Sequence, residues 1–121
     1  MFLFLQVLKL DFYPSLLGGI SFMISPYMIT MIVHGHGSQI MTAAYIPWIM
    51  WALIRLRSTL SLRNIGFLSL LIGLQLQRAH FQIAYYTWVI MGIYLTYDFI
   101  SGYISNKGVN VKFYLNWILS A

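Results

Sequence analysis

The sequence contains no cysteine and very little charge. Without cysteine the chain forms no disulfide and performs no thiolate chemistry. Only 7% of its 121 residues are Asp, Glu, Lys or Arg, whereas about 25% are charged in a typical soluble domain. Too few charged side chains are therefore present to cover a water-facing surface. This excludes a free-standing soluble domain and indicates a protein of the lipid bilayer.

Two further absences narrow the class of protein. The apolar stretch 1–8 has no basic residue before it and no small-residue cleavage site after it, so it is not typical of a cleavable signal peptide. No basic run is interleaved with polar sequence as a nucleic-acid reader needs, so no nucleic-acid partner is expected. In a membrane protein the net charge of +5 bears first on topology.

Apolar side chains make up 60% of the chain and are arranged in runs. A helix needs about 20 apolar residues to cross roughly 30 Å of hydrocarbon. We expect an all-α fold, a polytopic transmembrane helix bundle with about four full spans, forming a single transmembrane region over residues 1–121. Because apolar runs are cut at both ends, we interpret the chain as a fragment of a larger membrane protein. The expected spans are 1–8 (partial), 15–33, 40–56, 60–80, 82–100 and 113–121 (partial).

Prolines mark positions where these helices begin or bend. Pro14 is expected as an initial helical residue, because its missing N–H has no intrahelical partner there anyway. Pro26 and Pro47 fall inside apolar runs and are expected to kink their helices, with neighbouring helices meeting the freed carbonyls.

Polar segments separate the runs. A tight polar turn is expected over 34–39, with Ser38 as the N-cap of the helix that follows. The apolar run 65–76 is too short to span alone, whereas 60–80 has 21 residues and a helical length of about 31 Å. The segment 101–112 is expected to be a solvated loop.

The basic residues predict the orientation. If each run crosses once, six of the seven Lys and Arg residues fall on one side, which the positive-inside rule makes cytoplasmic. Only Arg78 falls on the other side, together with all three histidines. An arginine at the bilayer centre costs about 2.5–3.5 kcal/mol on insertion scales, so Arg78 is expected near the outer interface or facing a wet cavity. The six cytoplasmic residues are Lys9, Arg55, Arg57, Arg63, Lys107 and Lys112.

Two polar clusters are expected at the outer face of this cytoplasmic membrane. Helices that begin near Ser38 and Phe81 point their N-termini outward, and these ends carry free N–H groups and about half a positive charge. Gly35 and Gly37 allow a ligand close to the backbone, and Arg78 offers a fork that matches phosphate. The pattern predicts an outer-leaflet site for a phosphate or diphosphate head group. The clusters consist of His34, His36, Ser38 and Gln39, and of Gln75, Arg78, His80 and Gln82.

Structural roles compete with this interpretation. Gly35, Gly37 and Ser38 also suit plain turn and capping chemistry, which every helix end needs. Arg78 can extend along hydrocarbon and reach lipid phosphates with its charged tip. Gln75 and Arg78 share one helix face by their i, i+3 spacing, so both can instead hold helices together.

Metal and acid–base chemistry find little support. His34, His36 and His80 resemble a metal set, but no cysteine or nearby outer carboxylate completes it, so no metal or other cofactor is expected. Asp11 and Asp98 both fall on the cytoplasmic side, so neither serves as a general base at the outer face. The unperturbed pKa of a histidine side chain lies near neutrality, which suits His36 to that role, but the structural role, its ring N–H bonded to a helix end, is favoured.

At these two clusters the sequence resembles the bacterial YfhO-type integral membrane proteins. That family shows a serine-rich helix, a Gly-His turn, an Ala-x-x-Pro helix and an "LQ…xHxQ(I)xYY" segment. The resemblance covers roughly residues 15–100, and Gln39 stands where the family commonly has a lysine, which removes a cation. The matching residues are Gly35, His36, Gly37, Ala44, Pro47, Leu74, Gln75, His80, Gln82, Tyr85 and Tyr86.

The resemblance implies a membrane protein of the GT-C glycosyltransferase-like type. Such proteins take a sugar from a polyprenyl-phosphate carrier and transfer it to a cell-envelope acceptor on the outer face, and their catalytic acidic residue lies in a first large outer loop, which here is expected upstream of Met1. A transporter or permease segment and a non-catalytic lipid-binding module are the alternatives. The residues expected to bind the lipid-linked phosphate and sugar are His36, Arg78, His80, Gln75, Gln82, Gly35 and Gly37.

Overall fold

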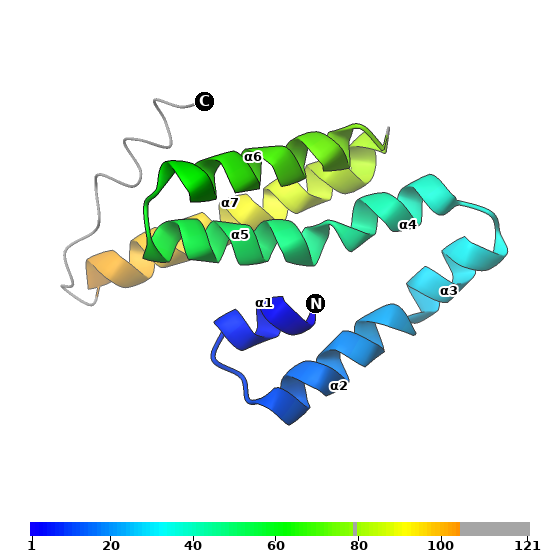
Figure 1. Cartoon of the computed structure of the whole chain (residues 1–121), viewed down its shortest axis with the longest axis horizontal. Helices are drawn as coiled ribbons and strands as arrows, with labels where there is room; N and C mark the ends of the chain where they lie inside the picture. The colour runs from blue at the N-terminus through cyan, green and yellow to red at the C-terminus, as the bar shows by residue number, and fades with distance from the viewer. Residues whose placement is uncertain (79, 105–121) are drawn as a thin grey trace. The chain divides into compact units, whose positions relative to one another are not determined.

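A computed structural model describes residues 1–78 and 80–104, and this part of the chain is all-α, as the sequence predicts. It divides into two units, Met1–Thr87 and Trp88–Ala121, which are described separately. The expected partial span 113–121 and positions 105–112 of the expected loop lie outside the described residues. In chain order the helices are α1 (Phe2–Val7), α2 (Phe12–Met23), α3 (Pro26–Val33), α4 (Gly37–Ala44), α5 (Ile46–Ser58), α6 (Leu62–Leu76) and α7 (Phe81–Ile104) (Figure 1).

The expected kink at Pro26 is a break between α2 and α3. The residue before a proline is forced away from helical geometry, and Ser25 accordingly has ψ 145°. The Ser25 Oγ accepts a hydrogen bond from the Met28 N–H at 3.5 Å, so it caps the new helix that Pro26 begins. At the other end, α2 starts two residues before Pro14, which lies in its first turn, where a proline is tolerated.

The turn between α3 and α4 is closed by a Schellman motif. Gly35 has φ 73°, and its N–H donates to the Ile32 carbonyl at 3.1 Å. The next N–H, that of His36, donates to the Met31 carbonyl at 2.9 Å. His36 then becomes the N-cap of α4, which begins at Gly37. The prediction that Ser38 is the N-cap was therefore wrong: α3 ends at Val33 as expected, but the turn after it is short and Ser38 already lies inside α4.

The expected kink at Pro47 is an interruption at Tyr45. Proline lacks the N–H that would donate to the carbonyl four residues earlier, so α4 ends at Ala44 and Pro47 occupies the second position of α5. The Tyr45 backbone stays near helical values, with φ −75° and ψ −20°, so α4 and α5 run on with little change of direction (Figure 1).

The core of the first unit lies around α5. Helix α5 packs against both α1 and α6, while α4 contacts α3, α5 and α6. Ile49 and Leu53 are completely buried. A smaller cluster joins Met28, Ala43 and Ile83, from α3, α4 and the start of α7. These contacts hold both ends of the α4–α5 run in place.

In the described residues, one stretch has both the length and the apolarity of a membrane span when α2 and α3 are taken together across the break at Pro26. Phe12–Val33, which comprises α2 and α3, has 22 residues and a mean hydropathy of 1.8. Such a stretch near the N-terminus is compatible with a membrane span or with a signal sequence, so the four-span bundle stays a prediction.

Two expected boundaries need correction. The span expected at 60–80 is instead α6 with 15 residues, about 23 Å long, because the helix ends at Leu76 and a turn follows. Conversely, α7 has 24 residues, so positions 101–104, expected in a loop, are helical.

Candidate functional site

The first polar turn presents two imidazole rings to solvent. The His34 Nδ1 lies 2.7 Å from the Thr30 carbonyl oxygen. A carbonyl can only accept, so Nδ1 carries the proton and donates. The rings of His34 and His36 lie 6.5 Å apart and are parallel within 7°. One imidazole is thus oriented by the end of α3, and it stacks beside the other.

The same turn supplies the N-terminus of α4. The N–H groups of Gln39 and Ile40 donate to the His36 carbonyl, at 3.1 and 3.3 Å. The first N–H groups of a helix have no intrahelical acceptor, and in α4 these belong to Gly37 and Ser38. No atom of another residue lies within 4 Å of where a Gly37 side chain would begin. The backbone here is therefore open to an approaching anion.

The second polar turn follows α6. The Arg78 N–H donates to the Gln75 carbonyl at 3.2 Å, which continues the last turn of the helix, and the Arg78 side chain is exposed. His80 is half-buried directly before α7. The Gln82 Nε2 donates to the Tyr86 hydroxyl at 2.9 Å, one turn further along α7. Gln82 is thus bonded within its own helix, while Arg78 extends from the end of α6.

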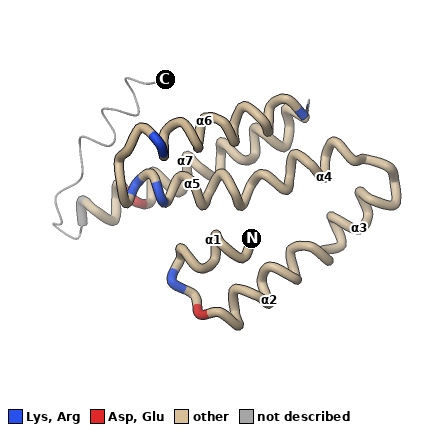
Figure 2. The backbone as a smooth tube through the Cα atoms, in the orientation of Figure 1, with Lys and Arg blue, Asp and Glu red and all other residues tan. Residues whose placement is uncertain are grey.

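Both turns lie at the same end of the first unit (Figure 1). The chain reverses direction at each turn, and the α3–α4 turn extends further out than the α6–α7 turn (Figure 1). Among the described residues, no hydrogen bond or ring contact joins His36 to Arg78 or His80. The one carboxylate in the sequence of this unit, Asp11, lies in the α1–α2 turn at the other end (Figure 2). The polar end therefore combines cationic and imidazole groups without a carboxylate from this unit.

Gln75 differs from the rest of the predicted set because it is fully buried. Its Nε2 donates to the Thr42 carbonyl oxygen at 3.1 Å and to the Thr87 Oγ1 at 2.8 Å. The two threonine hydroxyls donate in turn to the carbonyls of Ser38, at 2.7 Å, and Ile83, at 3.0 Å. The Gln75 Oε1 has no partner among the described residues. Gln75 therefore links α4, α6 and α7, the role of holding helices together that the sequence left open.

Thr42 and Thr87 were missed by reasoning from the sequence. Both are fully buried, and the Gln75 Nε2 donates to the main-chain carbonyl of Thr42 and to the side-chain hydroxyl of Thr87. The signal that was present is a small hydroxyl residue in each of the two helices, because such a side chain bonds the backbone of its own helix and, in Thr87, also accepts from a neighbour.

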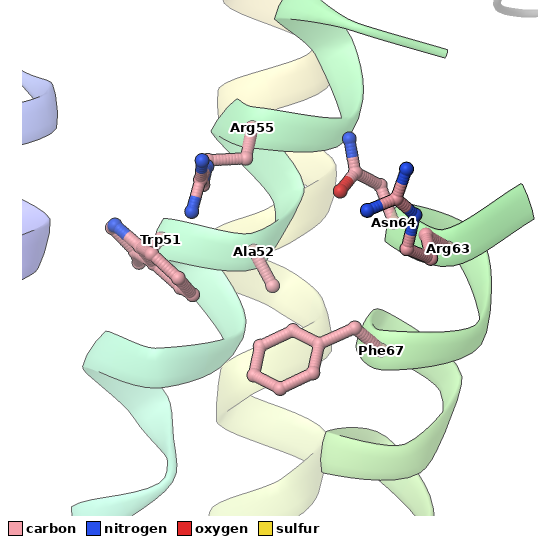
Figure 3. A pocket seen from close by; sticks show the side chains of 6 residues that line it. All are labelled: Trp51, Ala52, Arg55, Arg63, Asn64 and Phe67. Atoms are coloured by element: carbon pink, nitrogen blue, oxygen red, sulfur yellow. The ribbon is translucent and has the colours of Figure 1, made fainter. Parts of the chain in front are cut away.

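A cavity of about 280 Å³ lies between α5 and α6, at the end of the unit opposite the polar turns (Figure 3). The Arg55 Cζ lies 4.9 Å from the centre of the Trp51 ring, and the Trp51 and Phe67 rings meet edge to face at 5.8 Å. No carboxylate is among the described residues that line it. The lining residues are Trp51, Ala52, Arg55, Arg63, Asn64 and Phe67.

In the sequence analysis, the two arginines of this cavity served only to predict the orientation of the chain in the membrane. The available signal was a repeated spacing, since Trp51 precedes Arg55 by four positions and Arg63 precedes Phe67 by four. Residues four apart share one face of a helix, so each helix of the hairpin carries one aromatic ring and one guanidinium on the same face. Recognising the cavity also requires knowing that α5 and α6 pack together.

Among the described residues, no three His, Cys, Asp or Glu side chains gather closely enough to hold a metal ion. The chain matches no protein-family model, no curated protein and no solved structure. Function is therefore argued from the residues and their geometry.

Proposed function

We propose that the chain is part of a multi-pass protein of the cytoplasmic membrane that transfers a sugar from a polyprenyl-phosphate carrier to a cell-envelope acceptor on the extracytoplasmic face. The reaction type is taken from the resemblance to YfhO-type, GT-C-like proteins. The site is taken from the polar end of the first unit. The partners in this proposal are the bilayer, the lipid-linked sugar and the remaining transmembrane helices of the full-length protein.

The membrane location is supported by exposed apolar surface. Only 6% of the most apolar window of Phe12–Val33 is buried within the chain. Large side chains such as Met23, at 72% exposed, and Val33, at 76%, project outward from it. A contiguous apolar surface of this kind is rare on soluble monomers and marks contact with lipid or with other proteins.

The orientation is supported by the distribution of charge. Lys9 follows α1, Arg55 and Arg57 occupy the last turn of α5, and Arg63 lies in the first turn of α6. These positions lie toward one end of the helices, and Arg78 lies at the other (Figure 2). Under the positive-inside rule the end with several cations is cytoplasmic, which assigns the turns with histidines to the outer face.

The observation that carries the site is that the two polar turns lie at the same end of the first unit (Figure 1). The N-termini of α4 and α7 lie at this end with the histidines and Arg78 of the turns, whereas Asp11 lies in the α1–α2 turn at the other end (Figure 2). We assign the carrier phosphate to Arg78 and to the N–H groups at the start of α4, where Gly35 and Gly37 keep the backbone accessible. His36, His80 and Gln82 are assigned to the sugar–phosphate. The buried Gln75 side chain stabilises this end of the unit by linking α4, α6 and α7.

Alanine variants of Arg78 and His36 test the proposal in the full-length protein. Each is expected to abolish sugar transfer from a polyprenyl-phosphate donor while insertion into the membrane stays normal. Arg78→Lys keeps the charge but loses the fork, so it is expected to retain partial activity. Lys9→Gln removes an exposed cation from the opposite end and serves as the matched control. Normal transfer by Arg78→Ala and His36→Ala would refute the site.

One observation favours a transporter or permease segment as a second function. Gln75 places a buried amide among apolar helices, and its Oε1 has no partner among the described residues. Polar groups inside a membrane bundle often line substrate paths. A flux assay in liposomes, run beside the transfer assay on the same preparation, separates the two functions. If neither activity is found, a non-catalytic lipid-binding module remains.

A further inference from the structure

We propose that the cavity between α5 and α6 binds the phosphate of an anionic phospholipid, held between Arg55 and Arg63. This site is separate from the proposed sugar-donor site and lies at the other end of the first unit. The inference rests on the membrane location in the proposed function, and on nothing in its transfer activity.

The first argument is positive charge gathered at one cavity. Arg55 lies in the last turn of α5 and Arg63 in the first turn of α6, and the hairpin brings both side chains to the cavity (Figure 3). No carboxylate is among the described residues that line it. Two like charges on a shared cavity repel each other, and an anion between them converts that repulsion into attraction. A guanidinium offers two parallel N–H groups that match the oxygens of a phosphate.

The second argument is preorganisation of the arginine on α5. The Arg55 Cζ lies 4.9 Å from the centre of the Trp51 ring, within the range of a cation–π contact. A guanidinium that contacts a ring in this way still has N–H groups to donate to a ligand. The ring of Trp51 is itself fixed against Phe67 at 5.8 Å. Less side-chain entropy is therefore lost when an anion binds.

The third argument is the N-terminus of α6. Arg63 and Asn64 occupy its second and third positions, where backbone N–H groups have no intrahelical acceptor. The Asn64 Nδ2 donates to the Thr59 carbonyl at 2.7 Å, which ties this first turn to the loop before it. The helix end adds fixed N–H dipoles and partial positive charge to the two guanidiniums.

The apolar half of the cavity points to a lipid rather than a free anion. Trp51, Ala52 and Phe67 supply the apolar lining beside the two arginines (Figure 3). A volume of about 280 Å³ lies just below the usual range for pockets of drug-sized ligands, which suits a head group with its chains outside. Leu62, at 88% exposed, and Leu70 give the acyl chains an apolar surface along α6. Basic pockets between helices on the cytoplasmic side are suited to anionic head groups.

The test measures lipid retention by the purified full-length protein. The protein is exchanged into a neutral detergent, titrated with phosphatidylglycerol, and bound lipid is counted by native mass spectrometry. We expect one tightly retained phosphatidylglycerol, and we expect Arg55→Ala and Arg63→Gln each to weaken its affinity by about tenfold or more. Arg63→Lys is expected to fall between, because it keeps the charge without the fork. Arg78→Ala, which removes an arginine at the opposite end, is expected to retain the lipid fully.

Competition separates a lipid from a soluble anion. Inorganic phosphate and glycerol 3-phosphate, added at millimolar concentration, are expected not to displace the lipid, and phosphatidylcholine is expected to bind more weakly. Displacement by the soluble anions would overturn the lipid assignment, and unchanged retention by Arg63→Gln would overturn the site. Arg63 is exposed in the first turn of α6, so Arg63→Gln is expected to fold. This variant therefore tests the site even if Arg55→Ala fails to fold. If the Arg55 and Arg63 variants lose the lipid but still transfer sugar, the result supports this lipid site independently of the sugar-donor site. If the wild-type protein binds the lipid but transfers no sugar, the result counts only against the proposed function.

Discussion

The Gln75 Nε2 lies 2.8 Å from the Thr87 Oγ1, and both side chains are fully buried. Two helices that follow each other in the chain, α6 and α7, are thereby joined one to three turns below the polar turn that connects them. The second hydrogen on the same nitrogen reaches the Thr42 carbonyl at 3.1 Å, so α4 is held at the same point. This bond links the two halves of the polar end through the interior of the unit.

Thr87→Val tests how much the Gln75–Thr87 hydrogen bond contributes to the stability of the protein. The substitution leaves one buried Gln75 N–H without an acceptor, so we expect the free energy of unfolding to fall by about 1–2 kcal/mol. Gln75→Leu removes the Nε2 donor together with the unpartnered Oε1. We expect it to lower the free energy of unfolding by less, because no unsatisfied amide group remains. Unfolding of the purified protein in detergent, followed by circular dichroism, gives both values. A larger loss for Gln75→Leu than for Thr87→Val would contradict this account.

Gly35→Ala and Gly37→Ala form a matched pair at the first polar turn. Neither new methyl group meets another atom within 4 Å, so space does not distinguish them. Gly35 has φ 73°, a conformation that costs an L-residue about 1–2 kcal/mol. We therefore expect Gly35→Ala to destabilise the protein by about that amount and Gly37→Ala to leave its stability nearly unchanged, both measured by the same unfolding experiment. Equal losses would show that the Schellman turn is not what requires glycine.

The absence of cysteine makes the predicted orientation directly testable. Single-cysteine variants of the full-length protein, provided its other segments carry none, report on one position at a time. Ser38→Cys is expected to react with a membrane-impermeant thiol reagent in intact cells, whereas Ser58→Cys is expected to react only after the membrane is opened. Labelling of both positions in intact cells would place the two ends of the α4–α5 run in one compartment and remove the proposed outer site.

The features that were predictable from the sequence are those set by local covalent geometry. Pro26 and Pro47 fix breaks in their helices because a proline constrains its own neighbours wherever the chain goes. Ser38 was wrong as a cap for a related reason: the Schellman turn at Gly35 is short, so His36 becomes the N-cap of α4 and Ser38 already lies inside the helix. Composition suggests an N-cap residue, but the hydrogen bonds of the preceding turn decide which one is used.

Features that depend on packing were not predictable. The burial of Gln75 follows from the approach of α4 and α7 to α6. The end of α6 at Leu76, by contrast, coincides with the end of the apolar run 65–76, although the expected span was extended to 80. The cavity beside Arg55 requires Trp51 and Phe67, sixteen positions apart in the sequence, to meet across a hairpin. Short-range patterns locate the polar groups, whereas contacts between helices determine which of them face inward.

The two proline breaks have a mechanical consequence. Helices α3 and α4, eight residues each, contact one another and are separated from the longer α2 and α5 by Ser25 on one side and Tyr45 on the other. The α3–α4 hairpin is therefore not fixed by unbroken helix at either joint. It is held instead by the Gln75–Thr42 hydrogen bond and by the packing of Met28, Ala43 and Ile83. The position of the histidine turn at its end thus depends on one buried amide and one small apolar cluster.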